Sequence, residues 1–423
     1  MIPLSSNFEV NLERYVEVIV KVGLNLQPGQ RLLIGTPSST SYGVSLELAP
    51  LIRLIAKKAY QAGAKLVDVF WDDDQIRLIR YQNAPKDSFA EYPKWRADAG
   101  FDIAKNDDAM LIFPIRNPDL LSEQDPNLIL TTRKASLENN KPANDLRRKG
   151  KVNWSAIAAP LEDWTNKVLP HIPQEERKEK IWEIIFDICR INQKDPISVW
   201  KDHINQLITR SSYLNIKKYH ALKFKAPKTD LTVGLPQRHI WKSAYFTTQS
   251  GINNVVNIPT EEIFTTPHKD KTEGTVTASK PLVTDVLIEG LSLTFSEGKV
   301  IKASAKSGEE FLQKLLRTDE GATRLGEVSL VPHSSPISQS GLLFYNILID
   351  ENASCHLALG NGLRACLENG TVMSDEEFSK AGGNNCLFHL DFMIGSEDMD
   401  VDGVKEDGTL EPIMRKGEWA FDV

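Results

Sequence analysis

The chain lacks the cysteine patterns that identify secreted and zinc-ribbon proteins. Its 423 residues include only four cysteines, Cys189, Cys355, Cys366 and Cys386, and none of them forms a C-x-x-C pair. The irregular spacing argues against a disulfide framework and against a structural zinc knuckle, and it is typical of a protein in a reducing compartment. We therefore expect free thiols and a cytoplasmic location.

Long apolar runs and dense basic clusters are missing as well. No run approaches the roughly 20 apolar residues that span a bilayer, and the opening MIPLSSNFEV has neither the basic nor the apolar segment of a signal peptide. The net charge is −7, and lysines and arginines do not cluster with aromatic residues. We therefore expect neither a membrane nor a nucleic acid as a partner.

Several short motifs with a known mechanism are absent too. The sequence contains neither G-x-G-x-x-G nor G-x-x-x-x-G-K-[ST], so it gives no reason to expect a dinucleotide or a nucleoside triphosphate. It also lacks H-E-x-x-H and G-x-S-x-G. The common zinc-protease helix and the serine nucleophile elbow are therefore excluded.

What remains is a soluble globular chain that is too long for one ordinary core. Hydrophobic residues make up 41% of it and charged residues 25%, which is typical of globular proteins. In the first half, a buried strand at 31–35 is followed by a helical pattern that ends at Gly63 and by a second strand at 64–71. Strand, helix and strand in this order form a βαβ unit and predict a parallel sheet.

Further buried strands are predicted at 109–115 and 152–160, and helices at 175–192 and 196–214. From about residue 220 the pattern changes to short strands and turns, including a hairpin that turns near 296–299. We therefore expect an α/β protein with an N-terminal α/β domain at 1–220, built on a largely parallel sheet, and a C-terminal mixed α+β domain at 221–423.

The second half carries acidic residues and histidines beside apolar strand segments. Four stretches are notable: NIPTEEIFTTP (257–267), LGEVSLVP (325–332), DENASCHLALG (350–360) and FHLDFMIGS (388–396). They supply six candidate metal ligands, Glu262, Glu327, Glu351, His356, His389 and Asp391.

In FHLDF, alternation along a strand places His389 and Asp391 on one face, where an imidazole and a carboxylate can converge on a divalent cation. Carboxylates and imidazoles without a thiolate favour zinc, cobalt or manganese. Each stretch alone also fits a structural residue, such as a strand-edge glutamate, a core histidine or a His–Asp pair. The metal hypothesis depends on all four stretches, and their spacing does not show that they meet.

One further acidic stretch, DMDVDG at 398–403, matches the first half of a calcium-binding EF-hand loop. Loop position 12 would be Thr409, where a bidentate glutamate is needed, and no flanking helix pair is apparent. We interpret the stretch as a solvated turn before a hairpin.

The four stretches resemble the signature segments of the M29 family of metallo-aminopeptidases, which includes the aminopeptidase T and aminopeptidase S group. The order and approximate spacing of the segments are similar, and ERYVEVIVKVGLNLQPGQ and AKKAYQAGAKLVDVFWDDD extend the resemblance into the first half. The resemblance covers nearly the whole chain. It implies a two-domain homodimer with two divalent cations in the C-terminal domain and peptides as substrates.

By this resemblance, the six candidates fall on the metal-ligand positions of the family, and Glu261 is the solvent-facing neighbour of Glu262. Glu327 would bridge the two cations and is the candidate catalytic residue. The leading hypothesis is a dinuclear aminopeptidase that releases N-terminal residues through a hydroxide bridging the metals. One cation would polarise the scissile carbonyl group, and the other would hold the free α-amine of the peptide.

One position departs from the family pattern. Seven residues after the histidine of HLALG, the family has a tyrosine that is thought to assist catalysis, and this chain has Leu363. Loss of a phenol that stabilises an oxyanion would raise the barrier by a few kcal/mol. This departure favours one alternative, a catalytically impaired, metal-binding pseudoenzyme of the same fold. A separate, non-enzymatic alternative is a two-domain α/β ligand-binding protein whose carboxylates are ordinary solvated residues.

Overall fold

The computed structural model describes residues 6–36, 43–284 and 286–423. Its contacts divide the chain into two compact units. The first contains the chain up to Asn205 together with Ala244–Thr260, and the second contains Gln206–Ser243 and Glu261–Val423. The domain boundary at residue 220 stays a proposal. The first boundary between the two units, at Asn205 and Gln206, falls within helix α8 (Pro196–Lys217).

The first unit is built on a parallel sheet of five strands, as the βαβ pattern predicts. Its strands lie in the order β11 (Asn257–Ile258), β6 (Trp154–Ile157), β5 (Ala109–Ile112), β1 (Arg31–Ile34) and β3 (Leu66–Val69). Every neighbouring pair is parallel. Shorter strands are β2 (Val44–Ser45), β4 (Trp71–Asp72), β9 (Tyr245–Thr247) and β10 (Asn253–Val255).

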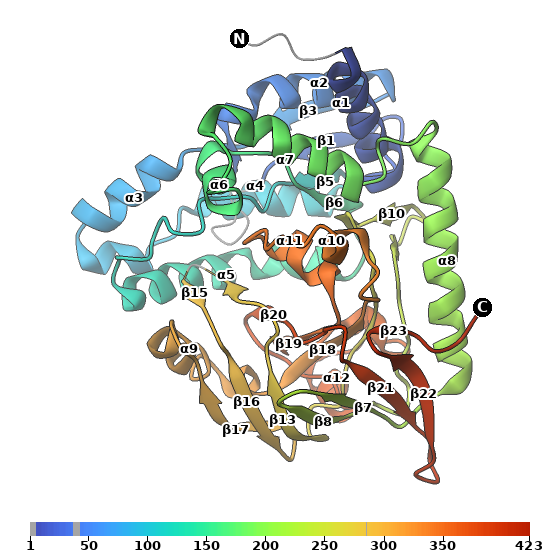
Figure 1. The fold of residues 1–423 in the computed structure, drawn as a ribbon. Coiled ribbons are helices and arrows are strands. Elements are labelled where there is room, and N and C mark those ends of the chain that lie inside the picture. The colour runs from blue at the N-terminus through green and yellow to red at the C-terminus, as the bar shows by residue number, and fades with distance from the viewer. Residues whose placement is uncertain (1–5, 37–42, 285) are drawn as a thin grey trace. The chain divides into compact units, whose positions relative to one another are not determined.

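Helices lie on both sides of this sheet (Figure 1). The helices of this unit are α1 (Ser6–Val18), α2 (Ala49–Gln61), α3 (Asp74–Asn83), α4 (Lys94–Lys105), α5 (Pro126–Arg148), α6 (Glu162–Val168) and α7 (Gln174–Ile188). In α2, the buried residues Leu51, Ile52 and Ile55 recur at helical spacing, so one stripe of the helix joins the core. The chain then turns at Gly63, whose φ of +95° is a left-handed conformation that glycine adopts without steric cost.

The second unit contains an antiparallel sheet of eight strands, which Figure 1 shows side by side in its yellow, green and red parts. Their order is β17 (Lys299–Ser304), β16 (Ser292–Ser296), β13 (Thr272–Thr277), β8 (Thr229–Gly234), β7 (Ala221–Ala226), β21 (Asp400–Val404), β22 (Leu410–Arg415) and β23 (Glu418–Trp419). The predicted hairpin is confirmed: β16 and β17 meet at a turn in which Glu297 and Gly298 have positive φ.

The interpretation of DMDVDG as a solvated turn was wrong for most of the stretch. Strand β21 begins at Asp400, and Met399 and Val401 are fully buried. Asp402 pairs with Arg415 on β22, and Asp400 accepts a hydrogen bond from the backbone N–H of Lys416. The stretch alternates acidic and apolar residues with a period of two, which is the pattern of a half-buried strand.

A smaller sheet of four antiparallel strands carries the candidate ligands. Its order is β12 (Ile263–Thr265), β18 (Leu325–Leu330), β19 (His356–Gly360) and β20 (His389–Met393). On one face, Val328, Leu357 and Phe392 align across three strands and are fully buried. Burial of each such side chain contributes about 1.5–3 kcal/mol, so this apolar face fixes the sheet that supports the polar one.

The remaining helices of the second unit are short. They are α9 (Glu309–Leu315), α10 (Pro336–Gln339), α11 (Ile347–Asp350) and α12 (Asp375–Lys380), and β14 (Leu282–Val283) and β15 (Leu287–Ile288) form a separate pair. Across both units, no helix in the described part of the chain is long and apolar enough to cross a membrane.

Candidate metal centre

Strand register brings the candidate ligands to one face of the small sheet. Glu327 on β18 pairs with Ala358 on β19, and Ala358 pairs with Asp391 on β20. Partners in adjacent strands point to the same side, and Ala358 places only a methyl group between the two carboxylates. His389 lies two residues before Asp391 and shares its face, as alternation along FHLDF predicts.

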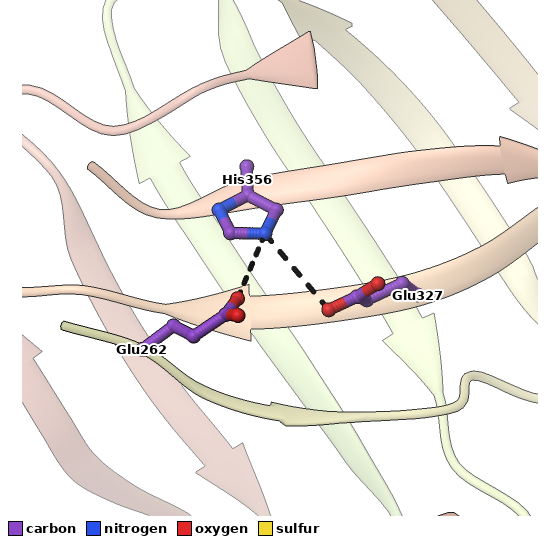
Figure 2. Close-up of side chains that lie close together, drawn as sticks. All are labelled: Glu262, Glu327 and His356. Carbon is purple, nitrogen blue, oxygen red and sulfur yellow. Dashed lines mark ion pairs between the residues drawn. The ribbon is translucent and has the colours of Figure 1, made fainter. Parts of the chain in front are cut away.

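A first group of ligand atoms comes from strands β18 and β19 and from the residue that precedes β12 (Figure 2). His356 opens β19, and its Nε2 atom lies 3.2 Å from Oε2 of Glu262 and 3.9 Å from Oε1 of Glu327. Glu262 directly precedes β12, and its Oε2 accepts a hydrogen bond of 3.0 Å from the Ser329 hydroxyl. One ligand atom from each of Glu262, Glu327 and His356 lies within 4.8 Å of the others.

A second group shares Glu327 with the first. Nε2 of His389 lies 2.9 Å from Oε2 of Glu327 and 3.1 Å from Oδ1 of Asp391. These three residues again offer ligand atoms within 4.8 Å of one another. The two oxygens of Glu327 therefore face different histidines, Oε1 toward His356 and Oε2 toward His389.

Both imidazoles are oriented by backbone carbonyl groups. Nδ1 of His389 lies 2.8 Å from the carbonyl oxygen of Asn361, and Nδ1 of His356 lies 3.3 Å from that of Ser354. A carbonyl oxygen only accepts, so the hydrogen-bond network assigns a proton to each Nδ1 and directs each Nε2 toward the carboxylates. This is the support that histidine ligands of metal ions commonly have.

Charged groups of the site raise the pKa values of a buried histidine and a buried glutamate. Burial alone lowers the pKa of His356, but its hydrogen bond to Glu262 and the fields of nearby carboxylates raise that pKa to about 10. Burial and the field of Glu262 raise the pKa of Glu327, whose hydrogen bond from His389 acts in the opposite direction. Buried carboxylates and imidazoles that draw protons in this way also fit a divalent cation.

Glu351 lies outside both groups of ligand atoms. It forms a short helical turn with Asn352 and Ala353 just before β19, and it is buried. Burial and the fields of Asp391 and Glu262 raise its pKa well above the ordinary value. Its predicted role as a ligand stays a prediction.

The structure also corrects the expectation for one residue beside the site and shows two contacts that the sequence did not predict. Glu261, which we expected to face solvent, is 5% exposed, and its backbone N–H donates to Oδ1 of Asn352. Ser329 and the carbonyl group of Asn361 were not predicted, because one is a small strand residue and the other acts through the backbone. The sequence has no local signal for such contacts, which depend on register between distant strands.

The donor set of the site is made of nitrogen and oxygen atoms only. Two imidazoles and three carboxylates gather in these groups without a thiolate, and such ligands suit zinc, cobalt or manganese. All four cysteines are free thiols. The residues present therefore fit a divalent cation.

Leu363 occupies a short loop after β19. It precedes a single helical turn at Arg364–Cys366 and is partly exposed. The loop is held by the next residue, because the Arg364 guanidinium pairs with Asp375 and stacks on Phe378 at 4.5 Å from the ring centre.

Comparisons with known proteins match the whole chain. A family described as thermophilic metalloprotease (M29) matches residues 8–419. Aminopeptidase 2 of Geobacillus stearothermophilus is 45% identical over 99% of this chain and 100% of its own length. Aminopeptidase T of Thermus thermophilus is 40% identical, covering 97% of this chain and 99% of the relative.

A solved structure of a relative has the same fold as this chain. Wild-type AmpT from Thermus thermophilus has a TM-score of 0.89 and 38% identity, with coverage of 98% of this chain and 100% of that one. The α/β fold class expected from the sequence is confirmed by this likeness and by the two sheets. The coverage, the identities and the shared fold together show that this chain is an enzyme of the M29 family of metallopeptidases.

Proposed function

We propose that the chain is a dinuclear metal-dependent aminopeptidase. The observation that carries the proposal is the position of Glu327, whose two oxygens face His356 and His389 in two groups of ligand atoms. Glu262 completes the first group and Asp391 the second. Glu351, buried beside them, is the sixth proposed ligand.

The charge of the site supports two ions. Glu262, Glu327, Glu351 and Asp391 would carry four negative charges when ionised, and two divalent cations would neutralise them. Without cations, buried like charges repel strongly. Zinc, cobalt and manganese all remain suitable by ligand type.

Bound there, the two cations would supply Lewis-acid chemistry, polarising the scissile carbonyl group and lowering the pKa of water toward neutrality. The residues of the chain have separate roles. His356 and His389 hold their Nε2 atoms in place through Nδ1, while Ser329 fixes one oxygen of Glu262. Glu327, at the centre, is the proposed carrier of a proton to the leaving amine.

The substrates follow from the relatives. Those compared above are aminopeptidases by name, and we carry this specificity to the chain as release of N-terminal residues from peptides. We also propose a homodimer, by resemblance to the family, and a cytoplasmic location, which the four free cysteines favour.

A second candidate rests on Leu363. If the missing phenol is essential, the chain is an impaired enzyme that binds metal and peptide ends without efficient turnover. The two candidates share the metal site and differ in rate, so metal content alone does not separate them.

Metal analysis and activity together test the proposal. The purified chain is expected to hold two divalent ions and to hydrolyse aminoacyl chromogenic substrates, and a chelator should abolish this hydrolysis until metal is restored. Metal without turnover would favour the impaired enzyme. Activity that survives complete removal of metal would contradict both candidates, and a chain without stoichiometric metal would be a ligand-binding protein instead.

A further inference from the structure

A segment before β12 extends the metal-bearing sheet by one more position. The backbone N–H of Lys242 donates to the carbonyl oxygen of Phe264 at 2.8 Å, and the N–H of Phe264 donates back to Lys242 at 2.9 Å. The two residues form an antiparallel bridge. Lys242 is therefore part of the sheet, beside β12.

Register places the side chain of Lys242 on the same face as the metal site. Phe264 pairs with Ser329, and Ser329 pairs with His356. Paired residues of antiparallel strands share a face, so one row crosses the sheet from Lys242 through Phe264 and Ser329 to His356. Glu262, which directly precedes β12, reaches this face as well, because its Oε2 accepts a hydrogen bond from the Ser329 hydroxyl.

The row passes from a buried end to an open end. Ser329 and His356 are at most 1% exposed, whereas Phe264 and Lys242 are partly exposed. A molecule that reached the buried ligands from this side would therefore lie over the Phe264 ring and beside the Lys242 ammonium.

The charge of Lys242 is not neutralised by the protein. Among the described residues, no carboxylate lies within ion-pair distance of its ammonium group. The strand register places Lys242 in the row that leads through Phe264 and Ser329 to His356. A half-buried cation without a carboxylate partner, next to a site for peptides, is suited to an anionic part of the substrate.

We propose that Lys242 determines specificity by binding a carboxylate of the peptide substrate. This inference rests on the proposed aminopeptidase function. Adjacent strands are about 4.8 Å apart, so the backbone of Lys242 lies about 10 Å from that of β18, and the flexible stem of lysine shortens this gap. A dipeptide spans roughly 7 Å, so it can place its amine end at the ligands and its carboxylate at Lys242.

Two carboxylates could occupy this position: the free C-terminus of a dipeptide and an acidic side chain of a longer peptide. Three probes separate them. Each has the scissile amide replaced by CH2–NH, which prevents hydrolysis: leucyl-leucine, its C-terminal amide, and leucyl-aspartic acid amide. Binding of each probe to the metal-loaded full chain is measured by calorimetry, so the result does not depend on turnover.

The wild-type chain is expected to bind at least one carboxylate probe with an affinity at least about tenfold higher than that for the leucyl-leucinamide probe. The reason is the charged hydrogen bond that the Lys242 ammonium donates to the carboxylate. Lys242→Met should remove this preference while leaving the affinity for the amide unchanged, and Lys242→Arg should keep most of it. Lys223→Met is the control, since Lys223 is a partly exposed lysine on the other sheet of the same unit.

The proposal would be overturned if the acid and amide probes bind the wild-type chain alike, if Lys242→Met keeps the preference, or if no probe binds. Tighter binding of the leucyl-leucine probe would identify the ligand of Lys242 as the C-terminus of a dipeptide. Tighter binding of the leucyl-aspartic acid amide probe would identify it as an acidic side chain. Failure of the aminopeptidase proposal gives a different result, namely intact probe binding without hydrolysis of leucyl-leucine.

Discussion

Oε2 of Glu327 lies 2.9 Å from Nε2 of His389. The same carboxylate reaches His356 through its other oxygen, at 3.9 Å. No other residue belongs to both groups of candidate ligands. Substitution of Glu327 therefore affects both proposed ions at once.

Glu327→Gln should lower kcat by about 10²–10⁴-fold, the usual contribution of a general acid or base, and should reduce the bound metal. The amide keeps the shape of the side chain but loses its charge and its ability to carry a proton. Elemental analysis and steady-state kinetics check the result. Glu368→Gln, at an exposed glutamate of the same unit, should change neither quantity, and normal activity of Glu327→Gln would remove Glu327 from the mechanism.

Ala358→Leu should weaken metal binding by about tenfold or more, in the range seen when groups that orient ligands are changed. The larger side chain would enter the space between Glu327 and Asp391, which flank Ala358 in the register. Titration with metal measures the affinity.

A matched control lies on the opposite face of the same strand. Leu359→Val should reduce stability by about 1 kcal/mol through lost packing without changing metal affinity, because Leu359 faces the apolar side. Equal metal affinity in Ala358→Leu and the wild type would show that this row of the sheet is not the metal site.

Leu363→Tyr should raise kcat by about tenfold or more with little change in KM, if a phenol there donates to the developing oxyanion. Leu363→Phe adds the ring without the hydroxyl group and should give no gain. Steady-state kinetics with one aminoacyl substrate compares the three proteins. Equal gains from both variants would show that the ring, not the hydroxyl group, is responsible.

Acid should destabilise the second unit through two histidines remote from the proposed ligands. Burial lowers the pKa of His239, whose Nδ1 atom bonds the carbonyl oxygen of Pro236, and burial with the field of Lys271 lowers the pKa of His268. A lowered pKa means that the unfolded chain takes up protons first. The stability that these groups contribute is complete above pH 6.5 and is lost as the pH falls through their folded pKa values.

The double variant with His239→Gln and His268→Gln removes this pH-dependent contribution to the free energy of unfolding. Urea unfolding at pH 8, 6.5 and 5.5 should show a smaller loss of stability in the double variant than in the wild type. His171→Gln, at an exposed histidine, should follow the wild type. Parallel curves for all three proteins would show that other groups determine the acid sensitivity.

Local pattern predicts much of this molecule, because periodicity depends only on neighbours in sequence. Alternation in FHLDF places His389 and Asp391 together, and the βαβ pattern around Gly63 predicts the parallel sheet. The same reasoning misread DMDVDG, where a resemblance to a calcium loop concealed the period of two that forms β21.

Long-range register is what the sequence leaves open. Nothing near Ala358 indicates that it separates Glu327 from Asp391, and nothing near Lys242 indicates that it joins the sheet beside Phe264. Such pairings depend on which strands meet, and strand order is decided by the packing of the whole unit. The family resemblance supplied the grouping of the ligands that periodicity does not provide.

The position of β11 also has a consequence for biosynthesis. This edge strand of the parallel sheet pairs with β6, yet it is translated after Gln206–Ser243, which belong to the second unit. Nascent chains generally fold domain by domain from the N-terminus, but here the first sheet stays incomplete until residue 258 has left the ribosome. A fragment that ends at residue 220 would leave β6 as an unpaired edge, and unpaired edges favour aggregation.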